Sequence, residues 1–152
     1  MKNLTFLLFF VPLVGCTDLP KVLDEQALSN DINIDKTIVL KNYTSFEWDR
    51  VYVFPPYTPK DKVKRESGLR KTTVIDTSDS ITLLVFKDQG LVVTYFEVKR
   101  YKADFSELYK EGGHSVSEAE FFVEHRDSWK YLVANKSVGG TPRGSASVVP
   151  PL

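Results

Sequence analysis

The sequence predicts a small α+β domain, in which antiparallel strands paired as hairpins or a meander form a sheet and two or three short helices cover part of it. The main observation lies at residues 81–98, where two apolar runs flank the tripeptide Asp-Gln-Gly, as in a β-hairpin. Residues 46–54 alternate like a strand and end at two prolines. Residues 59–67 are highly charged, begin with proline and precede Gly68, a pattern typical of a short exposed helix.

The chain before residue 46 carries weaker structural signals. Residues 16–31 are polar with scattered leucine and valine, and we expect them to form a tether that contains one turn of helix. Residues 32–43 bring the first dense group of apolar side chains. Both a strand and a short helix fit this segment, because runs this short do not separate the two periods. The predicted domain starts at residue 32.

The strand at residues 46–54 has two candidate core faces. Alternation places Trp48, Tyr52 and Phe54 on one face and two valines on the other. We expect the aromatic face to be packed, which makes Trp48 a core residue. The alternative is that the valines supply the core and the aromatic side chains form an exposed docking patch.

The middle of the chain predicts a helix and three further strands. Thr58 is suited to cap the helix at residues 59–67, with Pro59 at its first position. Residues 70–76 predict a strand. Residues 81–87 are apolar on both faces, which is typical of an inner strand covered on both sides. Residues 91–98 return as its hairpin partner.

The last third of the chain is less regular. Residues 104–110 predict a short helix, with Asp104 as N-cap and a glutamate three residues later. Residues 117–126 fit a strand, and also a helix that begins with a Ser-x-x-Glu capping box. We favour the strand, because a turn then leads into another alternating run at 129–134. Residues 135–152, rich in Gly, Ser and Pro, predict a disordered tail.

The first fifteen residues have the features of a secretory signal peptide. Lys2 precedes an apolar run at residues 4–14, which is shorter than the roughly 20 residues that a membrane span needs. The sequence that follows, Leu13-Val14-Gly15-Cys16, resembles a bacterial lipobox. That resemblance implies cleavage after residue 15 and attachment of lipid, including palmitate, at Cys16. Thr17 resembles the residue found in outer-membrane rather than inner-membrane lipoproteins. The alternative is an ordinary secreted protein.

Composition restricts the classes of partner and of stabilising bond. Twenty Lys and Arg residues balance twenty Asp and Glu residues, whereas a nucleic-acid-binding surface needs a basic excess. Cys16 is the only cysteine, so no disulfide can form within the chain. The fold must therefore depend on an apolar core, and residues 32–134 suffice for one domain.

The sequence contains no catalytic motif that stands out. It has neither the G-x-S-x-G sequence of serine hydrolases nor a glycine-rich phosphate loop. The only histidines are His114 and His125, and on a strand the glutamates beside His125 face away from it. We therefore expect no metal site and no cofactor.

The segment at residues 48–57, W-D-R-V-Y-V-F-P-P-Y, resembles one in small uncharacterised bacterial lipoproteins, where W-D precedes alternating apolar residues and P-Y. The resemblance implies a shared fold and no activity. Neighbours on a strand face opposite ways, so Asp49 and Arg50 cannot pair with each other. Basic residues also follow the hairpin. Our candidate binding surface comprises Asp49, Arg50, Tyr57, Lys99, Arg100 and Tyr101.

These observations predict a non-enzymatic lipoprotein of the cell envelope, held by its lipid on the periplasmic face of the outer membrane in a cell with two membranes. Its domain would bind an envelope protein or a wall polymer. One form of such binding is that of an inhibitor or immunity protein. The alternative is a small hydrolase that acts on the cell wall or on lipid. A cleft with converging carboxylates or a perturbed histidine would favour the hydrolase.

Overall fold

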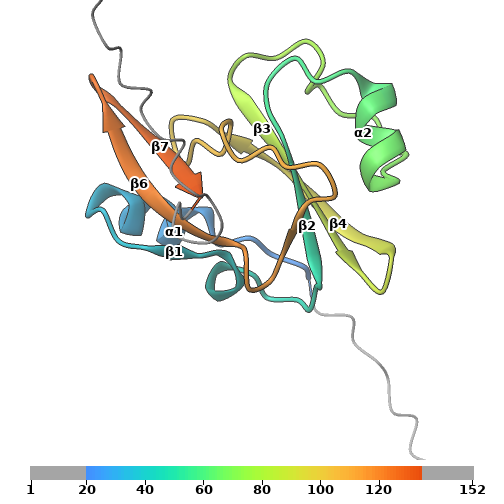
Figure 1. Ribbon diagram of the computed structural model, residues 1–152, viewed down its shortest axis with the longest axis horizontal. Helices are drawn as coiled ribbons and strands as arrows, with labels where there is room; N and C mark the ends of the chain where they lie inside the picture. Colours follow the sequence, from blue (N-terminus) through green and yellow to red (C-terminus); the bar gives the residue numbers. More distant parts are fainter. Residues whose placement is uncertain (1–19, 135–152) are drawn as a thin grey trace, which may run out of the picture.

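The computed structural model describes residues 20–134 and has the expected α+β fold (Figure 1). The lipobox and the predicted tail lie outside these residues. No helix in the described range is long and apolar enough to cross a membrane. In chain order the elements are α1 (Glu25–Asn33), β1 (Ile38–Val39), the 3₁₀ helix η1 (Leu40–Tyr43), β2 (Arg50–Phe54), α2 (Lys60–Ser67), β3 (Ile81–Asp88), β4 (Leu91–Lys99), β5 (His114–Ser115), β6 (Glu120–Arg126) and β7 (Trp129–Ala134).

The strands form two antiparallel sheets. One sheet has four strands in the order β4-β3-β2-β5, and the other has three in the order β1-β6-β7. Figure 1 shows the smaller sheet beside α1 on one side of the molecule and the larger sheet near α2 on the other. The segment between β4 and β5 and the β6–β7 turn bring the two sheets together, as the hydrogen bond from Leu132 N to Asp104 O shows.

The predicted β3–β4 hairpin is confirmed, and its two-residue turn has the backbone conformation that a tight reversal of the chain needs. Gln89 and Gly90 both have positive φ, 48° and 81°, which is the backbone of a type I′ turn. Asp49 supports this turn, because its Oδ2 accepts a 2.8 Å hydrogen bond from the backbone N–H of Gln89. Strand β3 is buried on both faces from Ile81 to Phe86, as expected of an inner strand.

Strand β2 packs on both faces, and within it the side chains alternate as predicted. Val51 and Val53 belong to the larger apolar cluster, whereas Tyr52 and Phe54 belong to a second cluster near α2. Trp48 is only 3% exposed, so its core position is confirmed, but it packs with the valines. The prediction that Trp48 shares a face with Tyr52 and Phe54 is wrong, although all three are buried as predicted, because the strand begins at residue 50 and alternation does not govern the residues before it.

The N-terminal boundary of the packed fold lies earlier than expected. Asp24 caps α1 by accepting a 2.9 Å hydrogen bond from the N–H of Ala27. Leu28 and Ile32, one helical turn apart, are buried in the larger cluster, and so is Leu23. The prediction of a tether to residue 31 is therefore wrong for residues 23–31. Residues 32–43 combine both predicted alternatives, because the short strand β1 is followed by a helical turn.

Three local predictions failed for identifiable reasons. Residues 70–76 form a loop, in which Ile75 O accepts a hydrogen bond from Tyr57 N. Residues 104–110 form no helix, because the Asp104 carboxylate bonds Ser106 N in a tight local turn. Thr58 does not cap α2, since its hydroxyl donates to Pro55 O instead. The predicted strands at β6 and β7 are confirmed.

Candidate binding cleft

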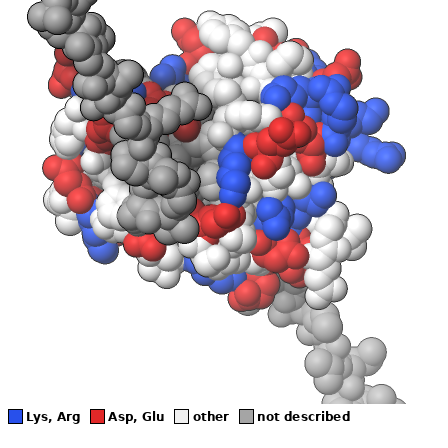
Figure 2. Space-filling model, viewed as in Figure 1, with Lys and Arg blue, Asp and Glu red and all other residues white. Residues whose placement is uncertain are grey.

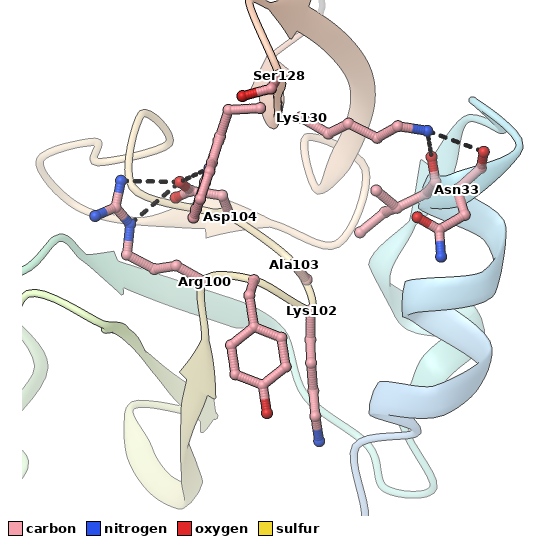
Figure 3. A pocket seen from close by; sticks show the side chains of 10 residues that line it. Asn33, Arg100, Lys102, Ala103, Asp104, Ser128 and Lys130 are labelled. Atoms are coloured by element: carbon pink, nitrogen blue, oxygen red, sulfur yellow. Dashed lines mark hydrogen bonds and ion pairs between the residues drawn. The ribbon is translucent and has the colours of Figure 1, made fainter.

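A divided hollow lies where the two sheets meet, between the segment after β4, the β6–β7 turn and the end of α1 (Figure 3). Its larger part has a volume of about 270 Å³ and its smaller part about 210 Å³. Arg100, Tyr101 and Trp129 line both parts, and we call the two together the Tyr101 cleft. The other lining residues are Ile32, Asn33, Lys102, Ala103, Asp104, Ser128 and Lys130 in the larger part, and Asp79 and Ser80 in the smaller.

A buried carboxylate forms the floor of the cleft. The Asp104 side chain is fully buried, and its Oδ2 lies 2.9 Å from Arg100 Nη2 and 3.1 Å from Arg100 Nε. Trp129 Nε1 donates to the same oxygen at 2.8 Å, and Ser106 N donates to Oδ1 at 2.9 Å. Figure 3 shows the guanidinium of Arg100 facing Asp104. Burial raises the pKa of Asp104, but the hydrogen bonds from Arg100, Ser106 and Trp129 outweigh it and lower the pKa below its ordinary value.

This arrangement makes Asp104 a structural anion. A carboxylate whose pKa is lowered stays ionised near neutral pH, so it cannot act as a general acid. Its oxygens already accept three hydrogen bonds from the chain and form an ion pair with Arg100 Nη2, which leaves little capacity to take a proton from a substrate. Asp104 therefore links the walls of the cleft to one another.

The two lysines of the cleft are also engaged. Lys130 Nζ reaches the C-terminal end of α1, where it donates to Asn33 O at 2.9 Å (Figure 3). The same Nζ lies 3.3 Å from Asp35 Oδ1. A cation at this end of a helix is favourable, because the last carbonyl groups carry partial negative charge. Lys102 Nζ pairs with Glu25 Oε2 at 2.8 Å. The cations of the cleft are therefore balanced, and Asp79 in the smaller part is a lining carboxylate without an ion pair within residues 20–134.

Neutral polar groups and aromatic faces are what the cleft leaves open. The amide of Asn33 and the hydroxyls of Tyr101 and Ser128 make no hydrogen bond to another residue within 20–134. The Tyr101 residue is 73% exposed and Trp129 is 39% exposed. Arg100 lies over the Trp129 ring, 5.8 Å from its centroid. The surface thus combines apolar rings with unengaged hydrogen-bonding groups.

The structure gathers only part of the predicted binding surface. Arg100 and Tyr101 line the cleft, and Lys99 precedes them at the end of β4. Asp49 and Arg50 lie at the opposite end of the larger sheet, because Arg50 pairs with Lys87 whereas Lys99 pairs with Ile81. Neither of the two is in an ion pair within the described range, since Asp49 accepts from the hairpin turn and Arg50 Nη1 donates to Gly112 O at 2.8 Å.

Tyr57 lies apart from the cleft on the loop before α2. It is 61% exposed and has a φ of 62°, a left-handed conformation that is unusual for an aromatic residue. Its N–H bonds Ile75 O at 2.8 Å, so the loop at 70–76 holds this conformation. Tyr57 is therefore an exposed aromatic residue without the polar surroundings of the cleft.

The cleft residues that the sequence did not single out include Asn33, Ser128, Trp129 and Lys130. They come from the C-terminal end of α1, which the sequence assigned to the domain boundary, and from the β6–β7 turn. The tryptophan directly after a polar turn was the available signal, because an aromatic side chain at the start of an edge strand is often exposed. Its role depends on the contact between the two sheets, which the sequence does not specify.

The charges and histidines elsewhere show no second candidate site. Figure 2 shows acidic and basic side chains intermixed, with a group of basic ones over α2. His114 Nε2 lies 2.7 Å from Leu108 O in the core, and His125 Nε2 lies 2.7 Å from Asp35 Oδ1. That hydrogen bond to His125 lowers the pKa of Asp35. Residues 20–134 contain no group of three or more metal-ligating side chains.

Comparison of the chain with protein-family models, with curated proteins and with solved structures finds no match. The function must therefore be argued from the residues of the cleft and from the N-terminal sequence.

Proposed function

We propose that this chain is a lipid-anchored lipoprotein of the cell envelope that acts by binding a protein or a wall polymer at the Tyr101 cleft. The observation that carries the proposal is the state of the cleft. The three cations that line it are paired with carboxylates of the chain, whereas the rings of Tyr101 and Trp129 are open to solvent. The protein could exert this binding as an inhibitor or immunity protein that blocks its partner.

The anchor in this proposal is the lipid on Cys16. Its support is the lipobox-like sequence and the single cysteine of the chain. Two acyl chains hold a protein stably at a bilayer, whereas one binds marginally, since each buried CH₂ contributes about 0.8 kcal/mol. Labelled palmitate should be incorporated by the intact protein and not by Cys16→Ala. Equal labelling of the variant would contradict the anchor.

Binding is favoured over hydrolysis because the cleft has no pair of groups suited to activate a nucleophile. Asp104 is saturated by its hydrogen bonds, and no serine hydroxyl within 20–134 bonds to either histidine. A hydrolase of the serine class needs that contact. A hydrolase with paired carboxylates would need a second acid beside Asp104, whereas Asp79 lines the other part of the cleft.

Capture experiments test the binding site. The processed protein in detergent micelles should co-sediment with purified envelope, and Tyr101→Ala should weaken this by about tenfold, because an exposed aromatic side chain is a common anchor of interfaces. Tyr57→Ala is the matched control, since Tyr57 is similarly exposed but lies outside the cleft. Equal loss in both variants, or no loss in either, would contradict the assignment of the site.

A further inference from the structure

We propose that the ligand of the Tyr101 cleft is a neutral glycan, whose sugar rings pack against Tyr101 and Trp129. The inference rests on the proposed function, because it names the class of ligand for the same cleft. Four features of the cleft carry it: the pairing of its cations, its aromatic faces, its unengaged polar groups and its division into two adjoining parts.

The charge balance excludes an anionic ligand as the best match. Each of the three cations that line the cleft has a carboxylate of the chain within 3.3 Å: Arg100 pairs with Asp104, Lys102 with Glu25 and Lys130 with Asp35. A phosphate or a carboxylate-rich ligand would have to compete with these partners for the same N–H groups. An uncharged ligand does not have to compete with these carboxylates for the N–H groups of the cations.

The two aromatic side chains match the apolar face of a sugar ring. A pyranose presents C–H groups on its faces and hydroxyl groups around its rim. Tyr101 and Trp129 are exposed large side chains, and each presents an apolar ring with a polar group at one end. A purely apolar ligand, such as an acyl chain, fits less well, because it would bury the polar groups of the cleft without partners.

The unengaged polar groups match the hydroxyl rim of a sugar. The amide of Asn33 both donates and accepts hydrogen bonds, and so does the hydroxyl of Ser128. Neither side chain is bonded within the described part of the chain. The hydrogen bond from Lys130 in β7 to the backbone O of Asn33 holds the end of α1 close to the turn that carries Ser128 (Figure 3). Segments that are already held in place lose less conformational entropy when a ligand binds.

The dimensions of the cleft suit a chain of small units. Pockets for drug-sized ligands are about 300–1,000 Å³, and the two parts of the cleft are smaller, at about 270 Å³ and 210 Å³. They share Arg100, Tyr101 and Trp129, so the two parts adjoin at these side chains. An oligosaccharide places one ring in each part.

Calorimetric titration of the processed protein in detergent tests the ligand class. The probes are a short oligomer of N-acetylglucosamine and a short oligomer of glucose, which separate an amino-sugar glycan from a plain hexose glycan. We expect saturable binding of at least one oligomer. Tyr101→Ala and Asn33→Ala should each weaken it by about tenfold, the equivalent of one good contact, whereas Tyr57→Ala should leave it unchanged.

The outcomes separate this inference from the proposed function. If neither oligomer binds but envelope capture still depends on Tyr101, the glycan inference is wrong and the binding site stands. If capture also fails to depend on Tyr101, both are wrong. Because Tyr101 and Asn33 are exposed, their variants should unfold at the temperature of the wild type, and this measurement excludes misfolding as the cause of lost binding.

Discussion

The indole Nε1 of Trp129 donates a 2.8 Å hydrogen bond to Oδ2 of Asp104, an oxygen that Arg100 also contacts. Trp129 begins β7 in the smaller sheet, and Arg100 directly follows β4 in the larger sheet. The backbone strengthens this junction, because Leu132 N donates to Asp104 O at 2.9 Å. Asp104 therefore links the two sheets beside the cleft, through its buried carboxylate and through its backbone carbonyl group.

The first prediction concerns this junction. Asp104→Ala should lower the free energy of unfolding by about 3–5 kcal/mol, because it leaves the largely buried charge of Arg100 without its partner. Urea unfolding measures the change. Glu47→Ala is the control: it breaks the pair with Lys41, but the Glu47 side chain is 88% exposed, so the loss should stay below about 1 kcal/mol. Similar losses in the two variants would contradict the anchoring role of Asp104.

The pH dependence of stability should follow from the same group. The pKa of Asp104 in the folded protein lies below its ordinary value of 3.8. Its contribution is therefore fully present above that value and is lost as the pH falls through the folded pKa, because the unfolded chain takes up the proton first. The stability difference between wild type and Asp104→Asn should shrink as the pH falls below 3.8. A difference independent of pH would contradict this assignment.

Two adjacent glycines give a matched pair of substitutions. Gly112 and Gly113 both have positive φ, so alanine is strained at either position, at a cost of about 1 kcal/mol. Only at Gly113 would the added Cβ meet backbone, 2.7 Å from Val51 O. Gly113→Ala should therefore destabilise the protein by clearly more than Gly112→Ala in thermal unfolding. The reverse order would show that β5 does not pack against β2 as described.

Trp48 is predicted to stabilise the fold and to have no part in binding. Its ring contacts Phe86 edge-on with centroids 5.2 Å apart, and its Nε1 donates to Thr44 Oγ1 at 3.0 Å. Trp48→Ala should therefore cost about 3–5 kcal/mol of stability. Tyr57→Ala, which removes an exposed ring, should change the melting temperature little. An unshifted melt of the Trp48 variant would contradict its burial.

Much of the larger sheet could be predicted from local sequence. The β3–β4 hairpin has its signal within the residues that form it, because a glycine-containing turn lies between two apolar runs. Residues 104–110 failed for the opposite reason, since Asp104 carries the sequence pattern of an N-cap. Its Oδ1 does accept from the N–H of Ser106, but its Oδ2 binds Arg100 and Trp129, which lie on distant segments, and no helix follows.

The candidate site was only half predictable. Arg100 and Tyr101 stood out as part of a basic segment after the hairpin. The opposite wall comes from α1 and from the β6–β7 hairpin. Lys130 and Asn33, which are hydrogen-bonded in this wall, lie 97 residues apart in the chain. Asp49 and Arg50 were selected for their sequence neighbourhood, but the register of β2 places them at the other end of the sheet.

The most direct test of the account is an NMR titration that follows the two indole N–H signals. The chain has two tryptophans, and Trp129 lines the cleft whereas Trp48 is buried in the core. On addition of soluble fragments of the cell wall, the Trp129 signal should shift and saturate while the Trp48 signal stays in place. A titration in which the Trp129 signal does not move, or in which both signals move alike, would contradict binding of a wall glycan at the Tyr101 cleft.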